Sequence, residues 1–385
     1  MTEVVIAGVG QTPVGEHWQL SLLNLAARAA QAARRDAGGL KPQALYVSNV
    51  LAATAQHQAN LGSLIAEDLG LAGIEGVTVE AAGASGGAAL RTAYIAVCSG
   101  MVDVALVVGV EKYTDVRPAE AEALLAQTLD SDFEALYGMT PATQAGLLMQ
   151  RYLHDYHLPR HALSGFPLIA HANAANNPNA MFRKAISQED YEGAEIVHDP
   201  LNLYDMAPYA DGAAALIVTR SELVPASVSH PLVSITGSSL VTDTLALHDR
   251  SDPLAWLAAG FSVERACRQA GILPSDVDFF EYCDAFSIFA ALSLEAAGFA
   301  RRGQGWQLAQ DGSLSLNGKL PAATLGGYKG RGNPIGAAGV YQVVEAALQL
   351  RGQAGKNQIQ DARRALVQSL GGPASTAVTH VLERM

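Results

Sequence analysis

The sequence predicts an α/β protein built from two similar halves. Short β-branched runs alternate with helical apolar spacings along most of the 385 residues, which is typical of a sheet covered by helices. Two patterns also occur in the same order in both halves. They are Asp36-Ala-Gly-Gly-Leu-Lys-Pro with Gln269-Ala-Gly-Ile-Leu-Pro, and Gly83-Ala-Ser-Gly-Gly-Ala-Ala with Gly332-Asn-Pro-Ile-Gly-Ala-Ala. Because each pair holds the same place between a helix and a strand or at a helix start, we interpret the chain as an internal duplication.

The first half alternates predicted strands and helices. The first helix, residues 21–37, precedes Gly38-Gly39, a plausible C-terminal cap. A second helical face carries Leu90, Tyr94, Val97 and Met101. The predicted strands of this half are residues 4–9, 44–50, 104–110 and 209–219. This order predicts a parallel sheet with helices on its faces.

The second half repeats the order, and a polar segment separates the two. The predicted strands there are residues 232–236, 279–282, 364–369 and 377–382, and the predicted helices are residues 254–270 and 338–350. The separating segment has little strand signal. We predict that it is mostly helical and covers the edge of the sheet where a ligand binds. We therefore predict a first half at 1–114 plus 205–228, an inserted domain at 115–204, and a second half at 229–385.

Composition narrows the class of function. Hydrophobic residues make up 49% of the chain, enough for a sizeable core, and the formal net charge is −12 without an extended basic run. This balance argues against nucleic acid and against an anionic membrane surface as main ligands. The three cysteines, Cys98, Cys267 and Cys283, are far apart and odd in number, which indicates neither a disulfide framework nor a zinc ribbon. With no basic leader before the first strand, we expect a cytoplasmic protein.

Further motifs in order give the chain its family resemblance. They are Val79-Glu-Ala-Ala-Gly-Ala-Ser-Gly-Gly, the strand 103–111 ending in Gly-Val-Glu, the stretch 171–182 with its Asn-Asn-Pro, Asp211-Gly-Ala-Ala-Ala, Glu281-Tyr-Cys-Asp-Ala-Phe, the stretch 326–339 ending in Gly-Asn-Pro-Ile-Gly-Ala-Ala-Gly, and Ser369-Leu-Gly-Gly. In this order and nearly end to end, the chain resembles the thiolases, specifically the sterol-carrier-protein type and its bacterial and archaeal relatives.

The resemblance implies a thiolase fold of two βαβαβαββ halves in a five-layered αβαβα arrangement with an inserted loop domain. It also implies a homodimer and a pocket for a CoA thioester, with no tightly bound cofactor and no metal. Relatives of the sterol-carrier type commonly pair with a small OB-fold protein that bears a zinc ribbon, so we expect such a partner here.

The usual thiolase side chains are missing from the matching positions. Family members attack the thioester with a cysteine, and the matching residue is Gly83. The histidine of the Glu-x-His-Asp motif is matched by Cys283, and the histidine before proline by Asn333. The late Cys or His falls near Gln368 and Ser369. Because glycine supplies no nucleophile, an acyl-enzyme at Gly83 is not expected.

Backbone N–H groups at the same positions would permit a reaction without a covalent intermediate. The Gly83 N–H at a helix start and an N–H near Gly371-Gly372, beside Ser369, would form an oxyanion hole for a thioester enolate. Such chemistry needs a general acid/base within reach. The candidates by position are Tyr282, Cys283, Asp284 and Tyr328, with Asn333 as a neutral donor.

Each candidate also has a structural interpretation. Gly83 as a plain tight turn and Cys283 as a buried thiol are the simplest ones. Tyr282 at a strand end packs in the core, and Asp284 caps a helix from Ala285. Tyr328, after two glycines, is expected on a loop as an exposed aromatic that contacts a ligand or partner. Its neighbours Lys329 and Arg331 are read as solvated charges or as contacts for CoA phosphates.

Three functions remain open from the sequence. The first is a thiolase-like acyl-CoA-binding subunit without covalent chemistry that works in a complex. The second is a non-covalent acyl-CoA aldolase or retro-aldolase that uses the oxyanion hole. The third is an acetyl-CoA acetyltransferase, which would require a thiolate at Cys283.

Overall fold

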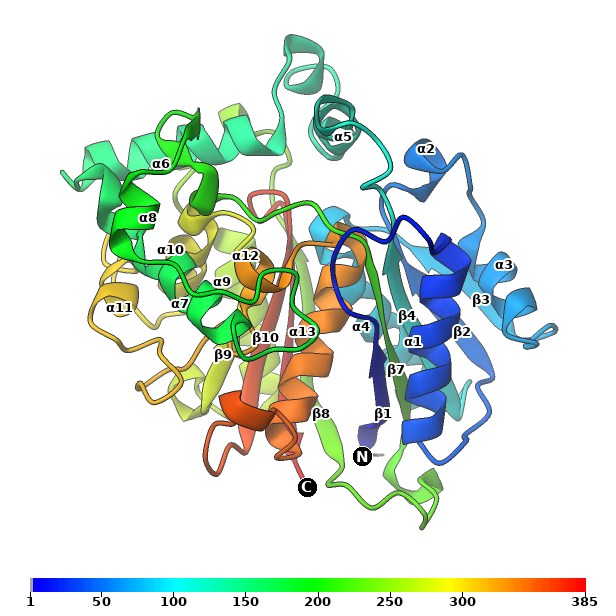
Figure 1. Ribbon diagram of the computed structural model, residues 1–385. Coiled ribbons are helices and arrows are strands. Elements are labelled where there is room, and N and C mark those ends of the chain that lie inside the picture. Colours follow the sequence, from blue (N-terminus) through cyan, green and yellow to red (C-terminus); the bar gives the residue numbers. More distant parts are fainter. Residues whose placement is uncertain (1–2) are drawn as a thin grey trace.

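The computed structural model describes residues 3–385, and its centre is a nine-stranded mixed sheet in the order β3-β2-β4-β7-β1-β8-β11-β10-β9 (Figure 1). The strands are β1 (Val4–Gln11), β2 (Ala44–Ser48), β3 (Glu75–Val79), β4 (Val104–Glu111), β7 (Gly212–Arg220), β8 (Val233–Thr242), β9 (Phe279–Glu281), β10 (Arg364–Gly371) and β11 (Thr376–Arg384). The two halves join where β1 and β8 pair at Val5 with Ser234 and at Ile6 with Val233. The short β1–β8 pairing is therefore the boundary between the two halves of the sheet.

Pairing patterns confirm the predicted duplication. In the first half, β2 runs parallel to β4, and β7 lies antiparallel between β4 and β1. In the second half, β9 runs parallel to β10, and β11 lies antiparallel between β10 and β8. The expectation of a purely parallel sheet was wrong for β7 and β11. Strand β11 follows β10 after a short turn and therefore returns antiparallel to it. Strand β7 returns antiparallel to β4 after the long segment between Glu111 and Gly212.

Helices complete five layers. They are α1 (Leu22–Asp36), α2 (Ala52–Ala55), α3 (Leu61–Asp68), α4 (Ser85–Cys98), α5 (Pro118–Leu125), α6 (Pro141–Asp155), α7 (Gly165–Ala174), α8 (Gln188–Glu192), α9 (Leu257–Ala270), α10 (Ser287–Ala296), α11 (Gln307–Gln310), α12 (Gly327–Arg331) and α13 (Ile335–Leu350). Helix α1 packs on β1, β4 and β7, and α9 packs on β8 and β11. Helices α4 and α13 contact both halves of the sheet and form the middle layer.

Local sequence explains where the main helices begin and how closely they pack. Helix α1 begins after Ser21, whose hydroxyl accepts from the N–H of Asn24 in a capping box. The two middle helices approach closely because a Cβ on Gly86 would lie 2.5 Å from the Val340 nitrogen. Helix α4 ends at Cys98, so Met101 lies beyond it and is exposed rather than on its apolar face.

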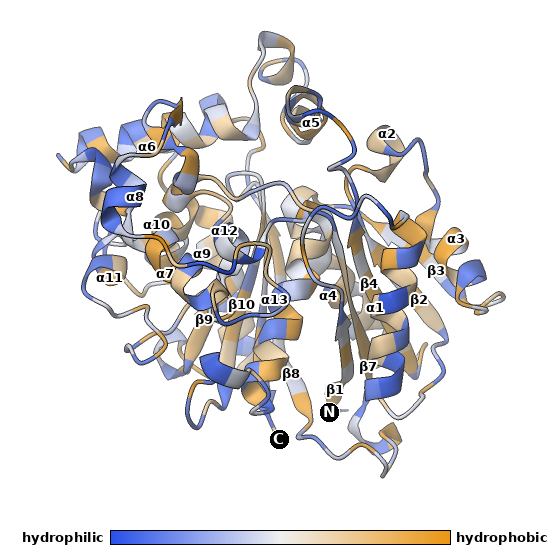
Figure 2. Ribbon diagram, in the orientation of Figure 1, coloured by the Kyte–Doolittle hydropathy of each residue, from blue (hydrophilic) through white to orange (hydrophobic). Residues whose placement is uncertain are grey.

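Hydropathy follows these layers. Figure 2 shows α8 as mostly hydrophilic and α1 with alternating colours, in keeping with helices that have one face in solvent. Almost all residues of α13 are buried, as a helix in a middle layer requires. The segment 115–204 contributes α5 to α8 and a small ribbon of β5 (Ile196–His198) and β6 (Leu201–Asn202). In Figure 1, α5 and α6 lie at the top of the molecule, and α7 and α8 lie at its left side near α10 and α11.

Candidate active site

A small cavity of about 70 Å³ gathers most of the predicted site residues. Gly83, Cys283, Tyr328, Asn333 and Gly372 all line it. They come from the starts of α4 and α13, from α12, and from the ends of β9 and β10. The duplicated fold therefore brings together segments that lie almost 300 residues apart in the chain.

Gly83 lies in a single 3₁₀ turn, Ala82–Ala84, that leads directly into α4. The Ser85 hydroxyl fixes this turn, since it accepts from the Ala81 N–H at 2.8 Å and donates to the Ala82 carbonyl at 2.6 Å. Ala82 has a φ of +49°, a strained value for a residue with a side chain. Within residues 3–385 the Gly83 N–H donates to no other group. It remains free at the positive end of a helix, as an oxyanion donor should be.

The backbone closes the place of a side chain at position 83. A Cβ on Gly83 would lie 2.5 Å from the carbonyl oxygen of Leu370, which is closer than real Cβ atoms approach. Leu370 belongs to β10 and pairs there with Ala377. Because a paired strand cannot move aside without breaking its hydrogen bonds, the backbone at this position favours a glycine.

Cys283 is held as a neutral thiol. The residue is buried, and burial raises the pKa of its thiol to about 12, with Asp284 adding to the increase. Only the thiolate is an effective nucleophile. The sulfur is therefore unsuited to act as a nucleophile near neutral pH, although Cys283 lines the same cavity as Gly83.

Tyr328 and Asn333 supply polar atoms to the cavity. The Tyr328 hydroxyl donates to Oε1 of Gln342 at 3.1 Å, and burial raises its pKa well above the usual value, so the phenol stays protonated. The backbone of Asn333 is fixed by its N–H to the Pro208 carbonyl and by the Tyr113 hydroxyl on its own carbonyl. Its side-chain Oδ1 is buried and has no partner within residues 3–385.

Three other predicted site residues, Tyr282, Ser369 and Gly371, do not line the cavity. The Tyr282 ring lies edge-on to Phe166 and Phe280. Ser369 donates to Oε1 of Gln342 at 3.0 Å. Gly371, unlike Gly372, is paired with Thr376 in the strand. These side chains and this backbone position are not among the residues that line the cavity.

Asp284 caps a different segment from the one predicted. Helix α10 begins at Ser287 and its N-cap is Phe286. Oδ1 of Asp284 instead accepts from the Tyr328 N–H at 2.6 Å. A Cβ on Gly327 would meet this carboxyl group, so the glycine lets α12 approach it. Asp284 thus positions Tyr328, and its Oδ2 is buried and without a partner among residues 3–385.

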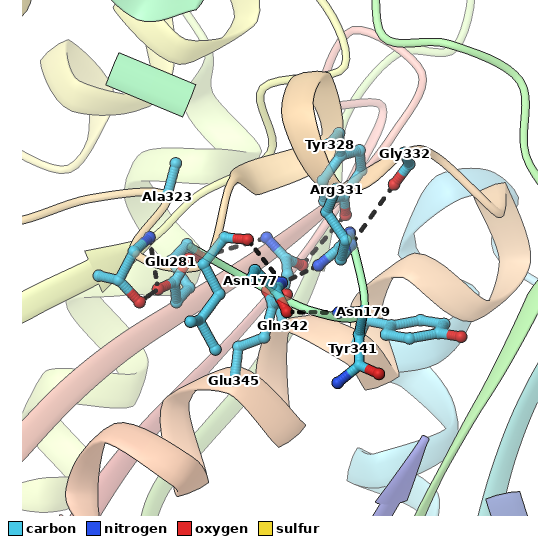
Figure 3. A network of polar contacts seen from close by, with 12 residues as sticks. Asn177, Asn179, Glu281, Ala323, Tyr328, Arg331, Gly332, Tyr341, Gln342 and Glu345 are labelled. Atoms are coloured by element: carbon cyan, nitrogen blue, oxygen red, sulfur yellow. Dashed lines mark hydrogen bonds and ion pairs between the residues drawn. The ribbon is translucent and has the colours of Figure 1, made fainter. Parts of the chain in front are cut away.

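The expectation that Tyr328, Lys329 and Arg331 are exposed was wrong. All three are fully buried on α12, a short helix that turns them inward. Arg331 pairs with Glu345 on α13 at 2.7 Å, and its guanidinium carbon lies 5.2 Å from the centre of the Tyr328 ring (Figure 3). Lys329 donates to the carbonyl oxygens of Tyr204 and Asp205. Neither cation is available to solvent or to the phosphates of CoA on the surface.

Gln342 connects the network that Figure 3 displays. Its Nε2 donates to the carbonyl oxygens of Tyr282 and Gln368, at 2.7 and 3.1 Å. Its Oε1 accepts from Tyr328 and Ser369. One amide on the middle helix α13 therefore fixes three of the segments around the cavity.

A second, larger cavity of about 720 Å³ adjoins the first. Glu122, Met206, Ala207 and Tyr209 line both. The remaining residues of the larger cavity are mostly apolar, with His171, Lys184, His198 and Lys329 among them. Glu122 could not be found from the sequence, because a single carboxyl group on a short helix carries no motif and only the fold brings it to the cavities.

Comparison with known proteins places this site in a family. Residues 4–222 match the model of the thiolase N-terminal domain, and residues 239–384 match that of the thiolase C-terminal domain-like family. The chain belongs to the thiolases. An acetyl-CoA acetyltransferase of Methanothermobacter thermautotrophicus is 37% identical over 386 residues, covering 100% of both chains.

Two further relatives refine the placement within the thiolases. Sterol carrier protein 2 of Bos taurus is 29% identical over 82% of this chain and 60% of that protein, in agreement with the sterol-carrier type. A solved structure named Ltp2-ChsH2(DUF35) aldolase superposes with a TM-score of 0.85 at 25% identity, covering 100% of this chain and 98% of that one. Proteins similar to this thiolase therefore include both an acetyltransferase and an aldolase.

The described residues contain neither a membrane-spanning helix nor a cluster of metal ligands. No helix among residues 3–385 has the length and apolar character needed to cross a membrane. In the same residues, no group of three or more His, Cys, Asp or Glu side chains is placed to bind a metal ion.

Proposed function

We propose that this thiolase is a non-covalent acyl-CoA aldolase or retro-aldolase. The observation that carries the proposal is the geometry at Gly83. This residue lines a cavity, its N–H has no partner among residues 3–385, and the Leu370 carbonyl oxygen lies 2.5 Å from where its Cβ would be. A backbone N–H stabilises an oxyanion without forming a bond to the substrate. The aldolase among the similar structures supports this choice over acyl transfer.

In the retro-aldol direction, the substrate is a 3-hydroxyacyl-CoA. Its thioester oxygen would accept from the Gly83 N–H and from an N–H near Gly372. A base takes the proton of the C3 hydroxyl, the C2–C3 bond breaks, and its electron pair forms the enolate of the thioester. A proton then returns to C2. The products are an aldehyde or ketone and a shortened acyl-CoA, and no oxidant or metal is needed for balance.

Protonated Tyr328 suits the acid side of this reaction. Its phenol lines the cavity with Gly83, and burial keeps its pKa well above the usual value. A neutral phenol donates a hydrogen bond to a developing negative charge, for which the Tyr328 O–H exchanges its partner Oε1 of Gln342 for the substrate. Cys283, whose thiol pKa is raised to about 12, offers a weak donor and no thiolate.

The test is direct. Purified protein is incubated with 3-hydroxy-3-phenylpropanoyl-CoA, and benzaldehyde and acetyl-CoA are followed by chromatography. We expect both products in equal amounts, while the intact mass of the protein stays unchanged. An acylated protein, or the absence of both products, would contradict the proposal.

A binding subunit without chemistry is the second candidate. The small volume of the Gly83 cavity, about 70 Å³, favours it, because a thioester needs more room unless side chains move. Tight binding of acetyl-CoA by calorimetry, together with no turnover of the phenyl substrate, is the result this candidate predicts.

We also propose that the protein forms a homodimer and works with a small OB-fold protein that bears a zinc ribbon. Strand β3 is an edge strand with one unpaired side, which supports association between copies. The inserted segment exposes Phe133, Leu136, Tyr137 and Leu147, a density of apolar side chains that is typical of a protein contact. The two-component name of the similar aldolase supports a partner. Light scattering of the protein alone and with proteins from neighbouring genes tests both.

A further inference from the structure

The two adjoining cavities are spanned by one face of helix α5. Pro118 and Ala119 line the larger cavity, and Leu125 lines the one that contains Gly83. Glu122 lines both. Residues four and three apart on a helix share a face, so the spacing of Pro118, Glu122 and Leu125 places the carboxyl group at the junction.

Apolar packing fixes α5 in this place. Ala121 and Leu125 are buried with Leu51 and Tyr113, and Ile335 at the start of α13 packs against this cluster. The helix is therefore attached to the layers that carry the site. The position of Glu122 follows from this packing and not from a mobile surface loop.

The Glu122 carboxyl group has an unused oxygen. Its Oε2 is buried and accepts no hydrogen bond within residues 3–385. Burial raises the pKa of this carboxyl group, while Thr140 and His198 partly oppose the increase. An acceptor that is partly withdrawn from water beside a cavity has the character of a general base.

We propose that Glu122 accepts the proton of the substrate C3 hydroxyl and that the larger cavity receives the carbonyl fragment. This inference rests on the proposed aldolase function. The thioester end occupies the Gly83 cavity, so the C2–C3 bond lies near the junction and the C3 substituent extends into the larger cavity.

Every proton in the retro-aldol step is accounted for. Glu122 takes the hydroxyl proton as the C2–C3 bond breaks and a C3 carbonyl forms. The electron pair of the broken bond becomes the thioester enolate, held by the Gly83 N–H. The proton on Glu122 is then returned to C2. One 3-hydroxyacyl-CoA thus gives one carbonyl compound and one shortened acyl-CoA.

The larger cavity also indicates the class of substrate. Its volume of about 720 Å³ lies in the range of small-molecule sites, and Phe182, Ile186, Val197 and Met206 give it an apolar wall. A bulky apolar or aromatic substituent at C3 fits such a chamber better than a methyl group. The cation Lys184 at its wall suits a polar group on that substituent.

The central test compares Glu122→Gln with wild type on 3-hydroxy-3-phenylpropanoyl-CoA. We expect kcat for benzaldehyde release to fall by about 10²–10⁴-fold, the usual contribution of a general base, with unchanged affinity for the probe by calorimetry. Glu122→Asp should recover part of the rate. The matched control is Glu120→Gln, an exposed carboxylate on the same helix, which should retain the wild-type rate.

The outcomes separate the two levels of the proposal. An active wild type with a fully active Glu122→Gln variant overturns the role of Glu122 alone. Wild type that releases no benzaldehyde overturns the aldolase function and this inference together. Equal melting temperatures of the three variants and wild type ensure that a lost rate is not a lost fold.

A second variant tests whether the larger cavity receives the C3 substituent. Val197→Trp fills part of the larger cavity and leaves the Gly83 cavity unchanged, since Val197 lines only the former. We expect the KM for the phenyl probe to rise at least tenfold, while cleavage of 3-hydroxybutanoyl-CoA keeps its rate. Equal effects on both substrates would contradict the placement of the C3 substituent.

Discussion

The carbonyl oxygen of Leu370 lies 2.5 Å from the position that a Cβ on Gly83 would occupy. The strand β10 thus fills the place where a side chain at position 83 would begin. A side chain at position 83 would therefore require this strand to move.

Gly83→Cys should therefore be costly and chemically unproductive. Overpacking against a paired strand usually costs about 1–3 kcal/mol, so we expect a lower melting temperature by calorimetry and no acyl adduct by intact mass after incubation with acetyl-CoA. Gly15→Cys is the matched control, because a Cβ there has no atom within 4 Å. A stable variant that becomes acetylated at position 83 would refute this interpretation.

Tyr328→Phe should reduce turnover while keeping the fold. The ring packing stays, and Oε1 of Gln342 retains its bond from Ser369. We expect a loss of about 1 kcal/mol in stability and of about 10²–10⁴-fold in kcat for retro-aldol cleavage. Tyr282→Phe, whose ring packs against Phe280 outside the cavity lining, should keep its rate. Equal rates for wild type and Tyr328→Phe would remove Tyr328 from the chemistry.

Arg331→Met should strongly destabilise the protein. Arg331 and Glu345 form a pair in which both side chains are only 1% exposed, and removing one partner leaves a buried charge. Such a loss costs about 3–5 kcal/mol, measurable by urea unfolding. The double variant Arg331→Met with Glu345→Leu should recover much of the lost stability, because it leaves no unpaired buried charge. The control is Arg268→Met in the exposed pair with Glu264, which should change stability by less than about 1 kcal/mol.

Stability should fall as the pH rises from 6.5 to 8. Burial raises the pKa of Glu281 to about 8 and those of Glu111 and Glu345 to about 7. In this window the unfolded chain has released protons that the folded protein still holds, so folding loses free energy with increasing pH. Buried His171 and His380, with pKa values lowered to about 4, act in the opposite direction, but only below pH 6.5.

Urea unfolding across this range measures the slope. Glu281→Gln keeps an acceptor for Thr324 and removes one titrating group, so its slope should be smaller than that of wild type. Glu264→Gln, at an exposed position, should leave the slope unchanged. A free energy of unfolding that rises from pH 6.5 to 8 would show that these carboxyl groups are ionised in the folded protein.

Much of the fold could be predicted from the sequence, because periodicity and glycine position encode it locally. Ser21 and the Gly38-Gly39 pair bound the first helix closely, and the repeated glycine patterns indicated the duplication before the pairing of β7 and β11 displayed it. Strand direction could not be predicted in this way. It depends on which neighbour a strand meets in space.

The shared location of the motif residues could be predicted from the sequence, and their roles in catalysis stay a prediction. Gly83, Cys283 and Asn333 meet in one cavity, as their places in the motifs indicated. The burial of Lys329 and Arg331 escaped prediction, because charged residues beside glycines usually face water and only the partners Asp205 and Glu345 on distant segments make burial possible. Glu122 also escaped prediction, because only the fold brings its helix to the cavities.

Hydrogen exchange at the methyl group of acetyl-CoA in D₂O tests the central claim most directly, because it detects the enolate at the Gly83 N–H without any second substrate. We predict that mass spectrometry finds deuterium in the acetyl group of acetyl-CoA while the protein keeps its unmodified mass. Protein carrying an acetyl group, or acetyl-CoA that stays free of deuterium, would contradict a site built for non-covalent enolate chemistry.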